Sequence, residues 1–209
     1  TVLAPPFAGN WKIQEGNGDG PHIGLGGRFA WDFAKVDEKG SELNPAARDR
    51  RQNASWFAWD QPVLAPADGR VETVEQAVPD NPLAGAVNDR APLGNVVVLK
   101  HDTGEFSLLA HLKKGSVTVK PGDAVTAGQE IARCGNSGNS PAPRLHLALL
   151  AQSDPPLGLP AVLAGATPKK GEIVKSGAAA PVAAAKPEPE PTRTKTGAAK
   201  VAGAAAGAA

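Results

Sequence analysis

Short runs of apolar residues, each closed by a turn signal, fill the chain from Gln61 to Leu150. The runs are rich in β-branched residues or alternate apolar with polar positions, and Asp-Gly, Thr-Gly, Pro-Gly and Ala-Gly pairs separate them. Five segments are expected to form strands and hairpins: residues 62–74, 94–104, 105–115, 116–135 and 143–150. The pattern predicts a mainly β fold built around an antiparallel sheet or sandwich.

Two segments interrupt this rhythm. Residues 35–59 are charged and contain the run RDRRQN, and residues 78–93 are rich in Pro, Gly, Asn and Asp. Neither keeps a helical or strand period, so both are predicted to be long surface loops. Such loops either grip a substrate or are solvated insertions, and the sequence favours neither alternative.

The carboxyl-terminal part differs in composition from the rest. From Gly177 onward the only branched apolar residues are Val182 and Val201, which is too little to offset the entropy of ordering. We expect a disordered tail, stiffened where KPEPEP favours polyproline II. The predicted organisation is a leading segment at 1–21, one β domain at 22–170, and an Ala/Pro/Lys-rich tail at 171–209.

Composition narrows the function. The 22 Lys and Arg nearly balance the 21 Asp and Glu, so the protein has no strong positive electrostatic field that would favour nucleic acid as a partner. No apolar run approaches the ~20 residues of a transmembrane helix. Cys134 is the only cysteine and is expected to be a small buried residue. A metal site within the chain must therefore draw on histidines and carboxylates.

Two segments place polar groups on one face of a strand. In PRLHLALL, three leucines share one face, and Arg144 and His146 share the other. In RFAWDFA, Asp32 shares one face of the predicted strand with two alanines, and the other face of that strand is wholly aromatic. This pattern leaves open whether Asp32 is a positioned functional group or an edge-strand carboxylate in water.

The remaining histidines differ in setting. His22 precedes a glycine-rich stretch that could fold back toward Asp32, and His111 ends the apolar strand in SLLAHLKKG. His111 is a candidate base or transition-state donor. His101 stands before a turn and is expected to pack or hydrogen-bond at its hairpin.

The order of these motifs resembles the lysostaphin- and LytM-type metallopeptidases of family M23. The motifs are a His, an Asp followed by an aromatic residue, APADGRV, AHL, VKPGDAVTAGQEIARCGNSGNS and LHL. The resemblance runs from about Leu3 to Leu163. It implies a β-sheet or sandwich of the duplicated hybrid motif type with long surface loops.

The resemblance also implies a zinc site. Its ligands would be His22, Asp32 and His146, with His111 beside the metal. The zinc would polarise a peptide carbonyl and activate water. The implied substrate is the peptide cross-link of peptidoglycan. That substrate, together with a sequence that begins at Thr1 without Met, leads us to expect an exported protein, periplasmic or extracellular.

One residue departs from the family pattern. Where that pattern reads HLH, this chain reads RLH, with Arg144 in place of a histidine. A guanidinium stays protonated and cannot act as a base. Arg144 could instead stabilise an oxyanion or bind a carboxylate, and it is our second candidate catalytic residue after His111.

Three functions stay open. The first is zinc-dependent hydrolysis, and the second is a weakened or inactive module that binds cell wall or a partner without cutting it. The third is a carrier domain of the biotinyl, lipoyl or phosphohistidine type, because VKPGDAVTAGQEIA also resembles those domains. The nearest modifiable lysines, Lys113 and Lys114, lack the flanking pattern of a carrier, which favours the first two.

Overall fold

A computed structural model describes residues 1–16 and 27–177. It is built almost entirely of strands, which are numbered here in chain order. They are β1 (Gly9–Gly16), β2 (Trp31–Lys35), β3 (Pro62–Leu64), β4 (Gly69–Glu75), β5 (Asn95–Lys100), β6 (Phe106–Leu112), β7 (Ala124–Val125), β8 (Glu130–Arg133), β9 (Leu145–Ser153), β10 (Pro156–Leu159) and β11 (Ile173–Ser176). The single helical turn assigned among these residues is the 3-10 helix η1 (Asn53–Ser55).

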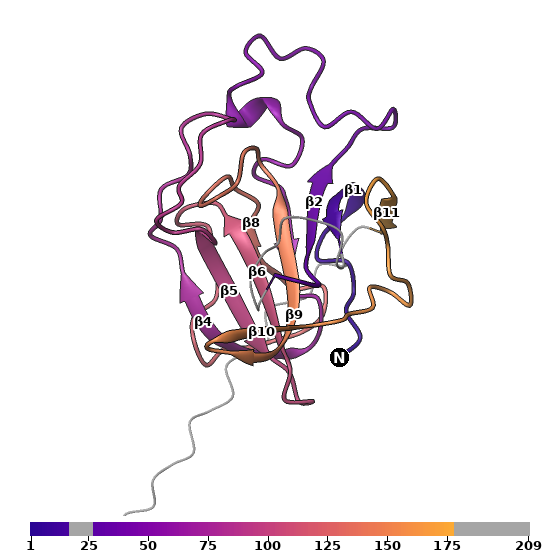
Figure 1. The fold of residues 1–209 in the computed structure, drawn as a ribbon, viewed down its shortest axis with the longest axis vertical. Coiled ribbons are helices and arrows are strands. Elements are labelled where there is room, and N and C mark those ends of the chain that lie inside the picture. The colour runs from indigo at the N-terminus through magenta and orange to yellow at the C-terminus, as the bar shows by residue number, and fades with distance from the viewer. Residues whose placement is uncertain (17–26, 178–209) are drawn as a thin grey trace, which may run out of the picture.

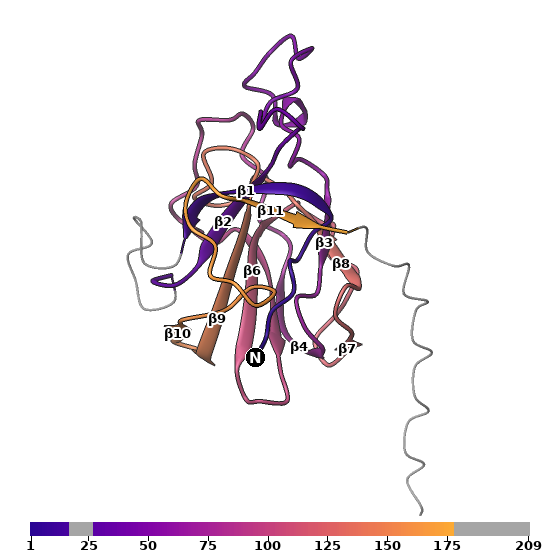
Figure 2. The same cartoon turned by 90° about the vertical axis from the view of Figure 1, so that its right-hand side faces the viewer.

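The main sheet has the order β11-β1-β2-β9-β6-β5-β4-β7, and β10 pairs with β9. A smaller sheet joins β3 to β8, and every pairing between named strands is antiparallel. The main sheet curls, so β1 and β11 run across the direction of β6 and β9 (Figures 1 and 2). The predicted mainly β, antiparallel fold is confirmed.

The core lies against one face of the main sheet. Alternation along the strands sends every second side chain there, including Leu145, Leu147 and Leu149 of β9. Phe7, Trp11, Trp31 and Phe33 add an aromatic group, in which Phe7 stacks on Trp11 with ring centroids 4.8 Å apart. Cys134 is buried in the same core, as expected, and burial raises the pKa of its thiol well above the ordinary value.

A second, smaller apolar cluster lies on the opposite face of the sheet. Its buried members are Ala30, Val98, Leu108, Ala110, Ala148 and Leu150. Both faces of β6 and β9 are therefore covered, and Asp32 of the neighbouring β2 is completely buried. The alternative of an edge-strand carboxylate facing water is wrong for Asp32, because β2 lies between β1 and β9.

The sheet extends beyond residues 22–170 at both ends. β1 lies in the segment expected to lead into the domain, and β11 lies in the segment expected to be tail. The pairing of Gly9 with Ser176 and of Lys12 with Ile173 joins these two strands. Residues 178–209, the rest of the expected tail, are outside the described residues.

The two long loops were predicted correctly and are fastened to each other. They lie above the sheet at one end of the molecule (Figure 1). The side chain of Asn53 donates to the carbonyl of Asn81 over 2.8 Å, and the backbone N–H of Ala84 donates to the carbonyl of Arg51 over 2.7 Å. These bonds join segments from both loops into one structure.

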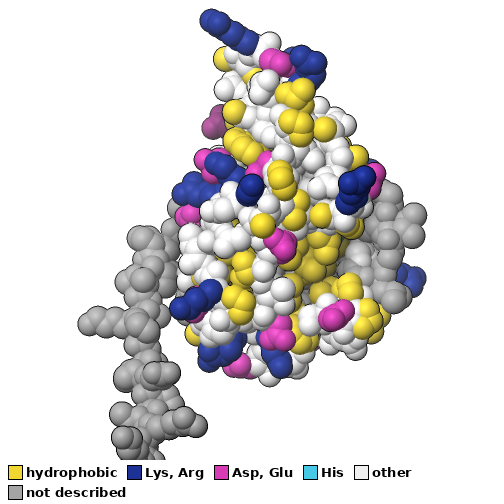
Figure 3. Space-filling view, turned by 90° about the vertical axis from the view of Figure 1, so that its left-hand side faces the viewer, with side chains coloured by type: hydrophobic (Ala, Val, Ile, Leu, Met, Phe, Trp, Pro, Cys, Tyr) yellow, Lys and Arg dark blue, Asp and Glu magenta, His cyan; other side chains and the backbone are white. Residues whose placement is uncertain are grey.

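Charge on the surface is mixed. On the face shown in Figure 3, Lys and Arg side chains alternate with Asp and Glu around a central band of hydrophobic side chains. This distribution agrees with the balanced composition. No helix of the described residues is both long enough and apolar enough to cross a membrane.

Candidate metal centre

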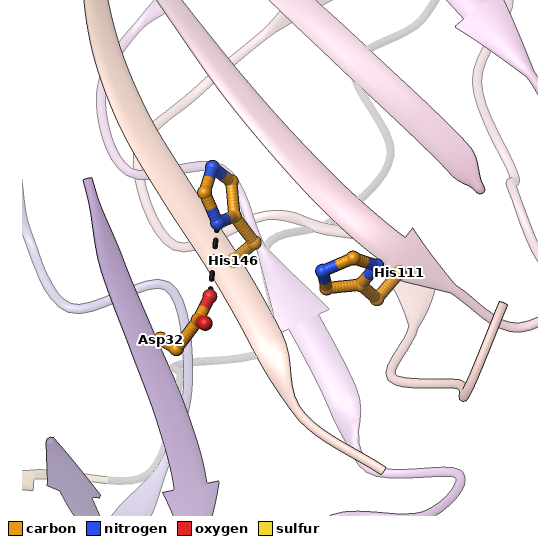
Figure 4. A group of neighbouring side chains, drawn as sticks. All are labelled: Asp32, His111 and His146. Atoms are coloured by element: carbon orange, nitrogen blue, oxygen red, sulfur yellow. Dashed lines mark hydrogen bonds and ion pairs between the residues drawn. The ribbon is translucent and has the colours of Figure 1, made fainter. Parts of the chain in front are cut away.

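Asp32 and His146 meet because β2 and β9 are neighbours. The register pairs these two residues directly, so their side chains leave the same face of the sheet. Nδ1 of His146 donates to Oδ1 of Asp32 over 2.9 Å (Figure 4). Asp32 is completely buried and His146 is 5% exposed. Strand pairing thus assembles this part of the site from residues 114 positions apart in sequence.

His111 reaches the same face through an irregularity in β6. Ala110 pairs with His146, so in a regular strand the next residue, His111, would point to the opposite face, into the core. Instead the register between β5 and β6 shifts, and His111 has a φ of 61°. This bulge turns His111 toward His146, with ring centroids 5.8 Å apart.

The loop after β8 fixes the orientation of the His111 ring. Its Nδ1 donates to the carbonyl of Ser137 over 2.9 Å, which leaves the lone pair on Nε2. Ser137 is held in turn, because its hydroxyl donates to the carbonyl of Leu112 and accepts from the backbone N–H of Asn95. Figure 4 shows that one ring nitrogen of His111 points toward Asp32 and His146.

The sequence patterns predict no role for Ser137 or Asn95. The feature that could have indicated the role of Ser137 is the segment GNSGNS, whose glycines permit a close approach of two backbones. A Cβ on Gly138, which has a φ of 79°, would lie 2.4 Å from the nitrogen of Gly94 and 2.6 Å from the carbonyl oxygen of Pro92.

Gly138→Ala is therefore expected to destabilise the protein by about 2–4 kcal/mol, since strain at positive φ adds to a backbone clash. Chemical denaturation measures the loss. Gly40→Ala is the matched control, because Gly40 has a φ of 80° with nothing within 4 Å of the added Cβ. It should cost only about 1 kcal/mol. Equal losses for the two variants would contradict a close approach at Gly138.

Arg144 also belongs to this cluster. Its Nη1 forms an ion pair with Oδ2 of Asp32 at 3.1 Å, and its Nη2 donates to the carbonyl of Asn139 over 2.9 Å. Its Nε is buried and has no hydrogen-bond partner among the described residues. The two oxygens of Asp32 thus contact different partners, Oδ1 the imidazole of His146 and Oδ2 the guanidinium of Arg144.

The donor atoms of Asp32, His111 and His146 all lie within 4.8 Å of one another. One carboxylate and two imidazoles form a donor set that suits a divalent transition metal, so the residues fit a metal ion. His22, the third expected ligand, lies outside the described residues. The structure brings together the other four expected site residues: Asp32, His111, Arg144 and His146.

His101 takes no part in this cluster. Its Nδ1 donates to the carbonyl of Asp68 over 2.7 Å, and its Nε2 accepts from the hydroxyl of Ser107 over 2.6 Å. Both ring nitrogens are thereby used between neighbouring segments of the sheet. The hairpin role expected for His101 is confirmed.

Part of this chain matches a known protein family. Residues 56–156 match the model of peptidase family M23. This match assigns residues 56–156 to a peptidase family M23 domain. The matched region contains His111, Arg144 and His146, whereas Asp32 precedes it and joins the site through the pairing of β2 with β9.

Proteins similar to this chain include one with a related sequence and several with solved structures. An uncharacterised metalloprotease of Haemophilus influenzae is 39% identical over 85 residues, which are 41% of this chain but only 15% of that protein. A mutant catalytic domain of the prophage-encoded M23 protein EnpA from Enterococcus faecalis has the same fold. Its TM-score is 0.50 and its identity 22%, over 75% of this chain and 93% of that one. The catalytic domain of lysostaphin from Staphylococcus simulans gives a TM-score of 0.43 at 24% identity, over 67% of this chain and 80% of that one.

Burial, together with the nearby positive charge of Arg144, lowers the pKa of His111 in the M23 domain to about 3, whereas Asp32 opposes the shift. The folded imidazole is neutral at neutral pH, but in the unfolded chain it takes up a proton below about pH 6.5. Folding stability of the chelator-treated protein is therefore expected to fall as the pH drops from about 6.5 to about 3. The slope from this group is at most about 1.4 kcal/mol per unit.

The contribution of His111 is isolated by comparison with His111→Gln. Other carboxyl groups titrate in the same range, so the quantity to measure is the difference between the two proteins. Unfolding free energies determined at several pH values should show a shallower decline for His111→Gln. Parallel curves would contradict a buried neutral imidazole at this position.

Proposed function

We propose that the chain is a zinc-dependent metallopeptidase that hydrolyses peptide bonds. The observation that carries the proposal is the buried cluster of Asp32, His111 and His146 in a chain of peptidase family M23. A buried carboxylate beside two imidazoles is costly to assemble for stability alone, which favours a functional role.

In this proposal the zinc ligands are His22, Asp32 and His146. Zinc fits because the expected donors are nitrogen and oxygen atoms from histidine and carboxylate. When bound, zinc supplies a Lewis acid that polarises a peptide carbonyl and makes water nucleophilic at neutral pH. The protein contributes a site whose ligand orientations are fixed by strand register and by hydrogen bonds.

His111 and Arg144 have different roles beside that metal. His111, with its Nδ1 committed to Ser137, offers the lone pair of Nε2 as a hydrogen-bond acceptor that orients the attacking water. Arg144 keeps its charge and so supplies donors that neutralise negative charge developing on the substrate oxygen.

The proposed substrate is the peptide cross-link of bacterial peptidoglycan. Support comes from the motif order shared with lysostaphin- and LytM-type enzymes, from APADGRV to LHL. A cell-wall substrate in turn implies an exported protein, periplasmic or extracellular. A peptide substrate, and no nucleic acid, also suits the mixed charge of the sequence.

A second function is favoured by Arg144 itself. If a histidine at this position supplies the base in related enzymes, its replacement removes roughly 10²- to 10⁴-fold of rate. A domain with that loss would act in practice as a module that binds cell wall or a partner. The two functions predict different products from the same substrate.

Metal content and turnover on purified cell walls decide between them. The full chain is loaded with zinc, its metal is quantified, and soluble peptide fragments released from the walls are measured by mass spectrometry. Release of fragments that stops on chelation supports hydrolysis. Zinc bound at one ion per chain without any fragments, combined with sedimentation of the protein with the walls, would support the binding module.

A further inference from the structure

The ion pair between Arg144 and Asp32 has an effect on metal affinity. Asp32 is the one carboxylate in the cluster with His111 and His146, so it carries the negative charge that attracts a cation. Its Oδ2 lies 3.1 Å from Nη1 of Arg144, at a site where the guanidinium side chain is 16% exposed and the carboxylate side chain 1%. Arg144 thus already neutralises the charge that a metal would neutralise.

We propose that Arg144 is a built-in counter-ion that keeps the site folded without metal and lowers its affinity for zinc. This inference rests on the proposed zinc site. Burying a charged carboxylate is costly, and the ion pair with the guanidinium offsets that cost in the metal-free protein. Guanidinium groups do not deprotonate in proteins, so the charge persists when a dication arrives.

Repulsion between that fixed charge and a dication acts at short range in a poorly solvated site, where electrostatic interactions are strong. Histidine ligands are neutral when they bind a metal, so Asp32 alone gives the site a net charge of −1, and Arg144 brings the total to zero. A neutral site attracts a dication less than a site of charge −1. The domain is therefore expected to exist in part as a folded, metal-free form.

The opposing possibility is that Arg144 only orients Asp32. Groups that hydrogen-bond a ligating carboxylate usually raise metal affinity, and their removal weakens metal binding by about 10- to 100-fold. Gln at position 144 separates the two effects, because it keeps N–H donors and removes the charge. Lys at the same position keeps the charge and loses the planar fork.

The experiment measures zinc affinity of the full chain by competition with a chromophoric chelator. Arg144→Gln is expected to bind zinc about 10- to 100-fold more tightly than the natural protein, because a repelling charge is removed, and Arg144→Lys to stay near it. In excess chelator, Arg144→Gln should melt at least about 5 °C lower, because Asp32 loses its counter-ion. Arg133→Gln is the matched control, since Arg133 pairs with Glu130 at the surface, where both are about 40% exposed.

Unchanged or weaker zinc binding by Arg144→Gln would overturn the inference, and so would an unchanged melting temperature in chelator. Should Arg144→Gln fail to fold without zinc, Arg144→His offers a second neutral side chain for the same comparison. The inference and the proposed function fail separately. Zinc affinities in the expected order without wall hydrolysis would refute only the peptidase activity, whereas hydrolysis with unchanged affinities would refute only the counter-ion.

Discussion

Asp32→Asn is expected to abolish zinc binding and to reduce peptide hydrolysis by about 10³-fold or more. The asparagine has nearly the same shape, so the contact with β9 can persist, but the negative charge of the cluster is lost. Arg144 would then carry a positive charge without its carboxylate partner and would repel a cation. Losing the Lewis acid removes several kcal/mol of transition-state stabilisation, which corresponds to a decrease in rate of about 10³-fold or more.

The measurements are zinc content after dialysis and release of soluble fragments from purified walls. Asp102→Asn is the matched control, because Asp102 is an exposed residue in the turn between β5 and β6 and undergoes the same chemical change. It should keep both zinc and activity. Full zinc occupancy in Asp32→Asn would contradict a role for this carboxylate as ligand.

Much of the fold followed from local patterns. The alternation of leucines in PRLHLALL placed His146 and Arg144 on the face opposite the core, and the structure buries Leu145, Leu147 and Leu149 together. The turn pairs between apolar runs correctly predicted antiparallel hairpins such as β5 with β6. These features are predictable because a period of two and a tight turn are properties of a few neighbouring residues.

Other parts of the site depend on contacts that no local pattern encodes. The pairing of Asp32 with His146 requires β2 and β9 to be neighbours across 114 positions. The bulge that turns His111 reflects a mismatch in residue number between β5 and β6. Strict alternation would send His111 into the core, so its position depends on register, not on its own sequence.

The sequence identified Arg144 as a departure but gave no indication of its partner. Only the geometry links Arg144 to Asp32, because the two residues belong to different strand regions that become adjacent in the sheet. A substitution that looked like the loss of one base also changes the charge of the proposed metal centre. Its effect on rate and its effect on affinity can therefore be measured separately.

Arg144→His is expected to raise hydrolysis of cell walls by about 10²-fold at saturating zinc. A histidine at this position would share the face of His146 and bring a neutral imidazole that can accept a proton, whereas the guanidinium cannot. Saturating zinc matters, since tighter metal binding alone would also increase activity at low zinc. The initial rate of fragment release, measured across a zinc titration, separates the two contributions.

Arg144→Lys serves as the control for charge, because it keeps a cation that is mostly protonated and adds no base at neutral pH. Its rate should remain close to that of the natural protein or fall below it. A decrease in rate for both Arg144→His and Arg144→Lys would assign catalysis to the guanidinium itself, through donors that only its planar fork can supply. A large increase for Arg144→His alone would identify the natural protein as an attenuated peptidase, in which Arg144 limits the rate through the absence of a base.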